Sequence, residues 1–339
     1  MKLEQITNDK TIGWLLEKEN PSVRYFTLTK LLNKSESDKE VLEAKDDIMK
    51  IGIVPAILDK QNEAGYWGEP QRFYTNKYSG TGWQLIILAG LGANMNDTRI
   101  KKACEFILHN SQDIESYGFA VRRSAKNGGG LHSEVIPCLT GNMIWSLIKF
   151  GYLNDERVMH GIAWICKYQR SDDGISDAPK DWPYDRFEIC WGKHTCHMGV
   201  VKSLKALSAI PKEQRTSSVA EKIQTLSEYM LIHHIYKKSH DLKSTSKPGW
   251  LKLGFPLMYQ TDILEILEIL VELDYCDSRM GEAIEKLRTK QNNEKRWDLE
   301  NTFNGRMIKD IEIKGKSSKW ITLKAFNVIR QFDGKLSLA

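Results

Sequence analysis

One apolar helix pattern recurs along the chain, and this repeat restricts the possible folds more than any other feature. TGWQLIILAGLG (81–92) and TGNMIWSLIKFG (140–151) align with a constant offset of 59 residues, pairing Thr81 with Thr140 and Gly92 with Gly151. Apolar residues at helical spacing predict a helix in each copy. Further copies lie at 21–32, 196–207, 261–273 and 319–332. The sequence therefore predicts six helices of one kind, spaced regularly.

A second set of amphipathic helices is predicted between them. Their ranges are 6–19, 40–60, 97–110, 155–169, 216–237 and 277–291. Strand-like alternation is nearly absent, apart from a possible short hairpin in RMIKDIEIKG (306–315). The prediction is thus an all-α chain of about twelve helices, arranged as six helical hairpins in a single domain over residues 1–339. Such a repeat can form an open solenoid or a closed ring.

Loop lengths favour the ring. Insertions of about 15–25 residues precede helices of the first set, whereas solenoids with short uniform turns need none. Long loops that gather on one face commonly carry function. We therefore expect a functional face at the starts of the first set of helices.

Composition excludes several classes of function. The net charge is only +5 over 339 residues, without a basic stripe, so no nucleic-acid partner is predicted. No stretch of 18 apolar residues predicts a membrane span. The N-terminus lacks a signal pattern, so we expect a cytoplasmic protein whose six cysteines are reduced.

QNEAGYWG (61–68) resembles the glutamine–tryptophan motif of the terpenoid cyclase and protein prenyltransferase superfamily. Gln61, Gly65 and Trp67 match that motif. Degenerate copies begin at Gln169 and at Gln291. The resemblance implies a single (α/α)6 toroid, with six inner helices whose N-terminal ends line a central cavity and six outer helices.

Other motifs of the superfamily are missing. The chain has no D-x-D-D run of the kind that donates the proton in class II terpene cyclases. Asp172-Asp173 lacks the D-D-x-x-D spacing of class I synthases and is interpreted as a solvated turn. Because squalene cyclases have two helical domains, this chain is closer in size to a prenyltransferase β subunit or a lanthionine cyclase.

A cysteine–histidine cluster predicts a zinc site. Cys138 opens the third inner helix, and Cys196-His197 open the fourth, 58 residues or one repeat later. The ring would place them at matching heights on neighbouring helices. Zinc takes three or four such ligands, so we predict Cys138, Cys196 and His197, with Cys190 as the fourth. His194 would act as a base or hold a ligand in place.

The arrangement resembles that of the lanthionine cyclases, where one cysteine opens one inner helix and a Cys-His pair opens the next. The flanks here, PCLTG and CHMG, differ from that family's. Two alternatives stay open: inert packing of buried thiols, or a bare thiolate nucleophile at a helix start. Cys104, Cys166 and Cys276 are expected to be ordinary core or surface residues.

Two loops are predicted to line the cavity mouth. They are KPGWLKLGFPLMYQTD (247–262) and LENTFNGRM (299–307). Asp262 and Tyr259 are predicted catalytic groups, although Asp262 could instead cap its helix. An aromatic mouth with few polar groups suits a ligand. The predicted substrate-binding residues are Trp191, Trp250, Phe255, Asn301, Asn304, Arg306 and Trp320.

Three functions follow from these observations. The first is a zinc-assisted enzyme of the terpenoid-cyclase or prenyltransferase kind, acting in the toroid cavity on an isoprenoid or other largely apolar molecule. The second is a lanthionine-cyclase-like zinc enzyme that forms thioethers in a peptide. The third is a non-catalytic toroid with structural zinc, which binds a ligand or a protein. The sequence leaves the oligomeric state undetermined.

Overall fold

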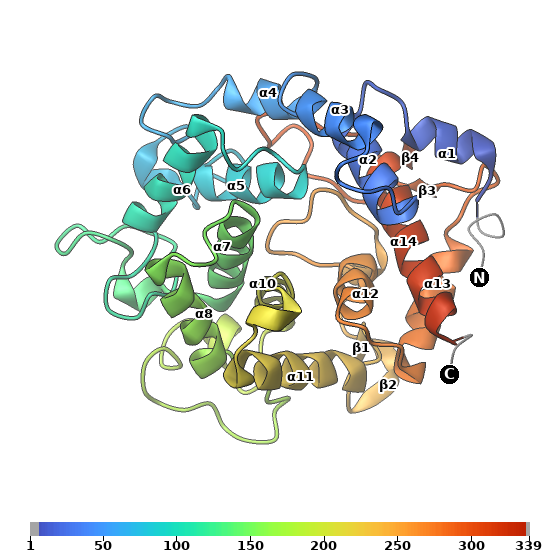
Figure 1. The fold of residues 1–339 in the computed structure, drawn as a ribbon. Helices are drawn as coiled ribbons and strands as arrows, with labels where there is room; N and C mark the ends of the chain where they lie inside the picture. The colour runs from blue at the N-terminus through green and yellow to red at the C-terminus, as the bar shows by residue number, and fades with distance from the viewer. Residues whose placement is uncertain (1–6, 337–339) are drawn as a thin grey trace.

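Six helices form the inner ring of a toroid in this computed structural model, which describes residues 7–336 (Figure 1). Their positions confirm the first predicted set. They are α2 (Pro21–Phe26, extended by a π-helical turn over Thr27–Leu31), α5 (Thr81–Gly90), α7 (Pro137–Lys149), α10 (His197–Ser208), α12 (Ile263–Glu272) and α14 (Lys319–Leu336).

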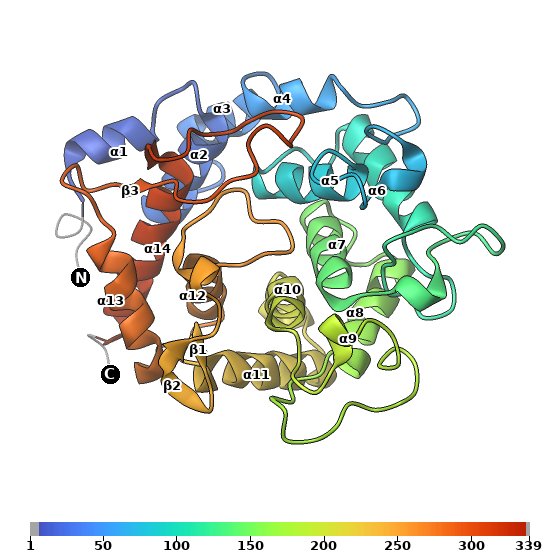
Figure 2. The same cartoon turned by 180° about the vertical axis from the view of Figure 1, so that it is seen from behind.

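The outer helices surround this ring, and α14 packs against α1 and α2 to close it (Figures 1 and 2). The outer set is α1 (Asp9–Leu15), α3 (Lys39–Asp47), α4 (Ile53–Leu58), α6 (Thr98–Asn110), α8 (Glu156–Tyr168), α11 (Ser217–Ile232) and α13 (Gly281–Thr289). A short extra helix, α9 (Glu188–Trp191), lies in the loop before α10. The predicted all-α toroid is confirmed. No helix within residues 7–336 is long and apolar enough to cross a membrane.

The second outer position differs from the prediction of one helix over 40–60. The chain forms α3 and α4 with a turn between them, and Gly52 in this turn has a φ of +83°. Only glycine adopts that conformation without strain, so the helix ends and restarts there.

Inner and outer helices differ in how much of their surface is covered. In α5 every residue from Thr81 to Ala89 is buried, because the helix is packed on all sides. In α6 the buried residues, such as Ile100 and Ile107, follow a single face. A helix that is apolar all round belongs to the interior, whereas an apolar stripe belongs to an outer layer.

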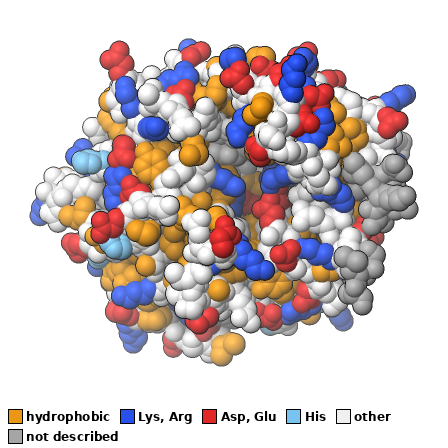
Figure 3. Space-filling view, in the orientation of Figure 1, with side chains coloured by type: hydrophobic (Ala, Val, Ile, Leu, Met, Phe, Trp, Pro, Cys, Tyr) orange, Lys and Arg blue, Asp and Glu red, His pale blue; other side chains and the backbone are white. Residues whose placement is uncertain are grey.

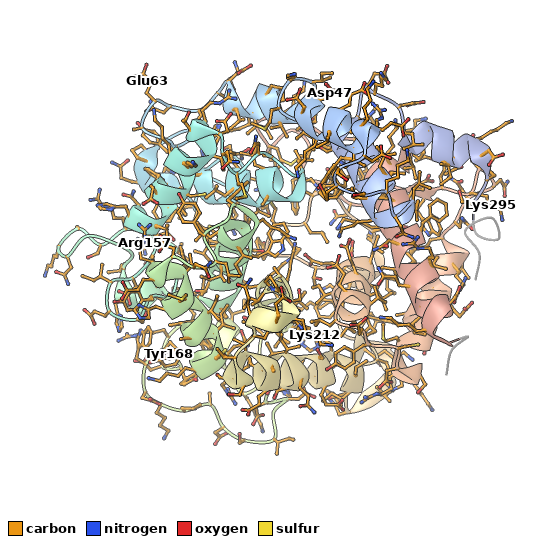
Figure 4. All side chains as sticks on the ribbon, in the orientation of Figure 1. Asp47, Glu63, Arg157, Tyr168, Lys212 and Lys295 are labelled. Atoms are coloured by element: carbon orange, nitrogen blue, oxygen red, sulfur yellow. The ribbon has the colours of Figure 1, made fainter. Side chains whose placement is uncertain are left out.

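Three outer helices begin with the same Asp-x-Arg sequence, at residues 97–99, 155–157 and 277–279. Asp97 and Asp155 cap α6 and α8, and Asp277 caps the 3-10 turn Ser278–Met280 that leads into α13. Each aspartate also binds the arginine two residues later. Arg157 also reaches back to Glu105 of the preceding outer helix, with N–O distances of 2.8 and 3.0 Å. Figure 4 labels Arg157 at the outer edge of the ring. These contacts join successive repeats.

The glutamine–tryptophan motif joins repeats in a similar way. Nε2 of Gln61 donates to the carbonyl oxygens of Gly65, at 3.1 Å, and of Arg99, at 2.9 Å. Nε1 of Trp67 donates to the carbonyl oxygen of Ile57 at 2.8 Å. The glutamine thus holds the next outer helix and the tryptophan holds the preceding one. Gly65 has a φ of +91°, and a methyl group there would lie 2.6 Å from the backbone of α6.

The described part of the chain forms two short antiparallel strand pairs. They are β1 (Lys237–Lys238) with β2 (Asp241–Thr245), and β3 (Trp297–Asp298) with β4 (Ser317–Ser318). The hairpin predicted at 306–315 is wrong. Asp310 accepts a hydrogen bond from the Gly305 N–H at 2.9 Å, and Glu312 accepts one from the Lys319 N–H at 2.7 Å. Such side-chain bonds to the backbone replace a strand ladder.

The loop between β2 and α12, residues 246–262, lies across the middle of the ring in both ribbon views (Figures 1 and 2). We call it the floor loop. It is held from outside by the segment that follows β3, because the N–H groups of Glu300 and Asn301 both donate to the carbonyl oxygen of Leu253 at 3.0 Å. The floor loop covers the end of the ring where the inner helices begin.

Candidate functional site

A cavity of about 1140 Å³ occupies the centre of the ring. It is lined mainly by the second halves of inner helices, and Gly254–Leu257 of the floor loop form its base. Figure 3 shows a hollow near the middle of the molecule, with acidic and basic side chains beside it. The cavity is thus displaced from the predicted position at the starts of the inner helices, because the floor loop fills that end.

Aromatic side chains form one part of the cavity wall. The rings of Phe255 and Trp320 are stacked, with centroids 4.5 Å apart and planes at 11°. Phe26 lies against the other side of Trp320, at 5.9 Å between centroids. Ile86 and Ile87 of α5 continue this surface. This part of the wall suits an apolar ligand.

A buried ion triad forms another part. Nζ of Lys202, from α10, lies 2.9 and 2.6 Å from the two carboxylate oxygens of Glu265, from α12. Nζ of Lys205 lies 2.9 Å from the same carboxylate and 4.0 Å from the centroid of the Trp145 ring. Burial opposes the ionised carboxylate, but the two lysines outweigh it and lower the pKa of Glu265 to about 2. The carboxylate of Glu265 is therefore ionised at neutral pH.

Two more glutamates of α12 pair with lysines from other inner helices. Glu268 binds Lys324 of α14, and Glu272 binds Lys30, which follows α2, at 2.6 Å. Glu265, Glu268 and Glu272 follow one face of α12, at i, i+3 and i+7. This helix therefore presents a line of carboxylates to the cavity, and each one is paired with lysine from another inner helix.

Asp262 caps α12 and also lines the cavity, so this one residue has both of the roles that the sequence suggested for it. Its Oδ1 accepts the Glu265 N–H at 2.9 Å, and its Oδ2 accepts the Gly254 N–H at 2.8 Å. The carboxyl is buried. Burial raises the pKa of Asp262 to about 7, although the two backbone bonds act in the opposite direction. Such a group can hold or release a proton at neutral pH.

Of the predicted catalytic and substrate-binding residues, Phe255, Asp262 and Trp320 line this cavity. Tyr259 lies elsewhere, with Nζ of Lys77 4.7 Å above its ring. Burial raises the pKa of Tyr259 to about 12, so its hydroxyl stays protonated at neutral pH. The structure therefore separates the two predicted catalytic residues of the floor loop.

The other predicted substrate-binding residues hold loops in place. Nδ2 of Asn304 donates to the Glu312 carbonyl oxygen at 2.7 Å, and Asn301 pairs with Gly254 through its backbone. The remaining three pack against rings outside the cavity lining. Arg306 lies over Tyr78 at 4.9 Å, Trp191 lies 5.4 Å from Tyr184, and Trp250 lies 5.0 Å from His197.

The thiols of Cys138, Cys190 and Cys196 lie near enough to influence one another electrostatically. Cys138 is in the first turn of α7, Cys190 is in α9 and Cys196 caps α10. Burial raises the pKa of Cys138, with further effects from the other two thiols, and raises the pKa of Cys190 to about 12. Without a bound cation, these two groups are protonated, which disfavours a bare thiolate nucleophile at either position.

His197 is turned toward other partners. Its Nδ1 lies 3.0 Å from the Tyr229 hydroxyl, and its ring meets that of His233 edge to face at 4.3 Å. Burial lowers the pKa of His197 to about 3, so the imidazole is neutral, and its buried Nε2 has no partner. Within residues 7–336, no three His, Cys, Asp or Glu side chains converge closely enough to hold a metal ion. In this arrangement the four predicted ligands do not form a metal site, and zinc stays a prediction.

The acidic pair and His194 lie beside this cluster. Asp172 accepts the Gly174 N–H at 2.8 Å, as expected for a turn. Asp173 is not solvated as predicted, since its Oδ1 lies 3.2 Å from Nε2 of His233 and its Oδ2 accepts the Ser239 hydroxyl. His194 is largely exposed, with its Nδ1 3.8 Å from Asp173. Its predicted role depends on the zinc site and stays a prediction with it.

Sequence reasoning missed the lysine–glutamate pairs. A signal was present, because an inner helix should be apolar all round. The α12 sequence ILEILEILVE carries glutamates on one face, and α10 carries Lys202 and Lys205 among buried residues. Ionisable residues on an inner helix must face a cavity or a partner charge.

Comparisons with known proteins indicate no family. No family model and no curated protein sequence matches the chain. It is similar to the solved structure of a GH76 alpha-mannanase from Bacteroides thetaiotaomicron, at 13% identity and a TM-score of 0.48, over 95% of this chain and 87% of that chain. It is also similar to a variant of the type II terpene cyclase MstE from Scytonema in complex with geranylgeranyl dihydroxybenzoate, at 14% identity and a TM-score of 0.42, over 93% and 88% of the two chains. At these values we infer no activity or substrate from either protein.

Proposed function

We propose that this protein is an enzyme that transfers a proton at Asp262, in the central cavity, to or from a largely apolar molecule such as an isoprenoid. One observation carries the proposal. Among the described residues that line the cavity, Asp262 is the carboxyl group without an ion-pair partner, whereas the glutamates of α12 are each paired with lysine. The unpaired carboxyl lines the same cavity as Phe255 and Trp320, against which an apolar ligand would lie.

The chemistry of Asp262 suits an oxygen or nitrogen atom of the ligand. General acids and bases work best when their pKa lies near the operating pH. A carboxyl with a pKa of about 7 can protonate such an atom and take the proton back. The ring faces of Phe255 and Trp320 would stabilise positive charge that develops nearby on the ligand. No step of this proposal passes through zinc at Cys138, Cys190, Cys196 and His197, and zinc assistance remains a separate hypothesis, as does the thioether-forming alternative that depends on it.

A non-catalytic toroid that binds a ligand is the second candidate. It is favoured by the neutralised carboxylates of α12, which leave a single acidic group for chemistry. The two candidates agree on the cavity as the binding site. They differ in whether Asp262 changes the ligand.

Incubation with extracts of isoprenoids and other lipids, followed by mass spectrometry, tests the proposal. Asp262→Asn removes the acid but keeps the helix cap, since asparagine caps about as well as aspartate. Asp38→Asn is a matched control, because Asp38 caps α3 at a half-buried position outside the cavity lining. We expect wild type and the control to consume a compound that Asp262→Asn leaves intact. Equal consumption by all three would overturn the role of Asp262. Binding without consumption by any of them would favour the second candidate.

A further inference from the structure

Lys149, at the end of α7, is the cation among the described residues of the cavity wall that makes no salt bridge. Lys30, Lys205 and Lys324 each bind a glutamate of α12. Lys45, at the rim, binds Glu36. No ion pair or hydrogen bond joins Lys149 to any described residue, and its side chain is open to the cavity. The ammonium group is therefore available to a ligand.

The charges around the cavity do not balance. On the inner helices, five lysines at or just behind the wall face three glutamates of α12. The lysines are Lys30, Lys149, Lys202, Lys205 and Lys324. Two more carboxylates of the lining, Asp46 and Asp97, belong to the outer layer and are paired with Lys50 and Arg99. Asp262 supplies at most one further negative charge. A concave wall with excess positive charge attracts an anion and holds it more strongly than an exposed surface would.

The amide nitrogen of Asn327 is a second polar group of the cavity wall without a partner, and it would favour an acceptor atom on the ligand. Asn327, on α14, is buried at the cavity wall, and its Oδ1 accepts a hydrogen bond from Gln331 at 3.1 Å. Its Nδ2 has no partner. A buried amide N–H without an acceptor costs free energy, so a ligand oxygen there would be stabilised.

The apolar part of a ligand has a place in the same cavity. Trp145 precedes Lys149 by four residues on α7, so both lie on one helix face. The apolar residues of α5 and the stacked rings of Phe255 and Trp320 continue the surface toward the floor loop. The volume of about 1140 Å³ exceeds the range of about 300–1,000 Å³ typical of drug-sized ligands.

We infer that the cavity binds an amphiphilic anion, whose carboxylate or phosphate ester group is held by Lys149 and whose apolar chain lies against Phe255 and Trp320. The inference rests on the proposed function in that it takes the same cavity as the active site, and it adds the class of substrate. Burial and the charges of Lys30 and Lys205 lower the pKa of Lys149, although Glu272 and Glu268 act in the opposite direction. An anion bound there would offset the mutual repulsion of the three lysines.

Calorimetric titration tests the inference, with dodecanoate and dodecyl phosphate below their critical micelle concentrations and dodecanol below its solubility limit. Wild type should bind at least one anion more tightly than the alcohol. Lys149→Met should weaken anion binding by about 10- to 100-fold, as expected for loss of a hydrogen bond to a charged group. Lys149→Arg should restore much of the affinity. Lys101→Met, on the exposed face of α6, is the matched control and should bind like wild type.

The preferred anion identifies the head group as carboxylate or phosphate. Equal affinity of wild type for the alcohol and both anions would overturn the inference, as would unchanged anion binding by Lys149→Met or the absence of binding to wild type. Asp262→Asn separates the two proposals, because it should bind the anion at least as tightly as wild type while losing turnover. If Asp262→Asn loses turnover but Lys149→Met binds anions normally, the head-group site is wrong and the proton-transfer proposal stands.

Discussion

The Oδ2 atom of Asp262 accepts a hydrogen bond from the backbone N–H of Gly254 at 2.8 Å. The carboxyl that is proposed to transfer a proton therefore also fixes the base of the cavity. Its other oxygen caps α12 through the Glu265 N–H. One side chain thus couples the start of an inner helix, the floor loop and the chemistry of the site.

The two structural roles of Asp262 can be separated from its acidity. Asp262→Ala loses both backbone bonds and should lower the free energy of unfolding by about 1–3 kcal/mol, combining a lost cap with an unsatisfied buried N–H. Asp262→Asn keeps an acceptor for the Glu265 N–H but places its NH2 group against the Gly254 N–H, so it should lose less than Asp262→Ala by roughly 1 kcal/mol, the contribution of the cap. Urea denaturation of both variants measures the difference. Equal losses would show that the cap bond to the Glu265 N–H contributes little and that the loss of stability comes from the bond to Gly254.

The pH dependence of stability should report the buried carboxyl. The pKa of Asp262 is about 7 in the folded protein and about 3.9 in the unfolded chain. Between these two pH values, the native state therefore keeps a proton that the unfolded state has released. Stability from this group is complete below about pH 4 and declines as the pH rises through about 7. Relative to Asp262→Asn, wild type should therefore lose on the order of a few kcal/mol between pH 4.5 and 7.5. A constant difference between the two proteins would mean that Asp262 titrates normally.

The buried triad and the exposed pair on α12 should respond differently to the same change. Glu265→Gln leaves Lys202 buried without a carboxylate and should cost about 3–5 kcal/mol of unfolding free energy. Glu272→Gln breaks a pair whose side chains are 39% and 40% exposed, and should cost less than about 1 kcal/mol. Chemical denaturation of both variants provides the measurement. Similar costs would show that Lys202 finds water or another acceptor in solution.

Zinc content tests the predicted metal site. Wild type and Cys104→Ala, made with ample zinc, should carry about one ion per chain, and Cys138→Ala and Cys196→Ala should carry little. Binding would require the His197 ring to leave Tyr229 and would release protons from the thiols, so occupancy should fall on acidification. Metal-free wild type would show that the cysteines pack as neutral thiols.

The helices could be predicted because each apolar pattern is local to its segment. The 59-residue offset between Thr81 and Thr140 gave the repeat, and α5 and α7 begin where that pattern begins or a few residues before it. The one-repeat spacing of Cys138 and Cys196 likewise predicted that these residues would lie at the starts of successive inner helices, and they lie in the first turn of α7 and at the N-cap of α10. Periodicity predicts which helices are neighbours and which of their residues lie at the same height in the ring.

The cavity could not be predicted in the same way. The course of the floor loop depends on contacts with a segment about 47 residues away, such as the bonds from Glu300 and Asn301 to Leu253. The direction of the His197 ring depends on Tyr229 and His233, which belong to another helix. The partners of the α12 glutamates come from three different helices. The spacing of residues along the chain does not predict such contacts between distant segments.

The floor loop gives the central cavity a dead end. A molecule that enters from the open side of the ring must leave by the same route, so the chain cannot thread a polymer through its centre. Product and substrate would then compete for one opening, and product should act as a competitive inhibitor. Slow release of a long apolar product, rather than proton transfer, would set the steady-state rate under such conditions.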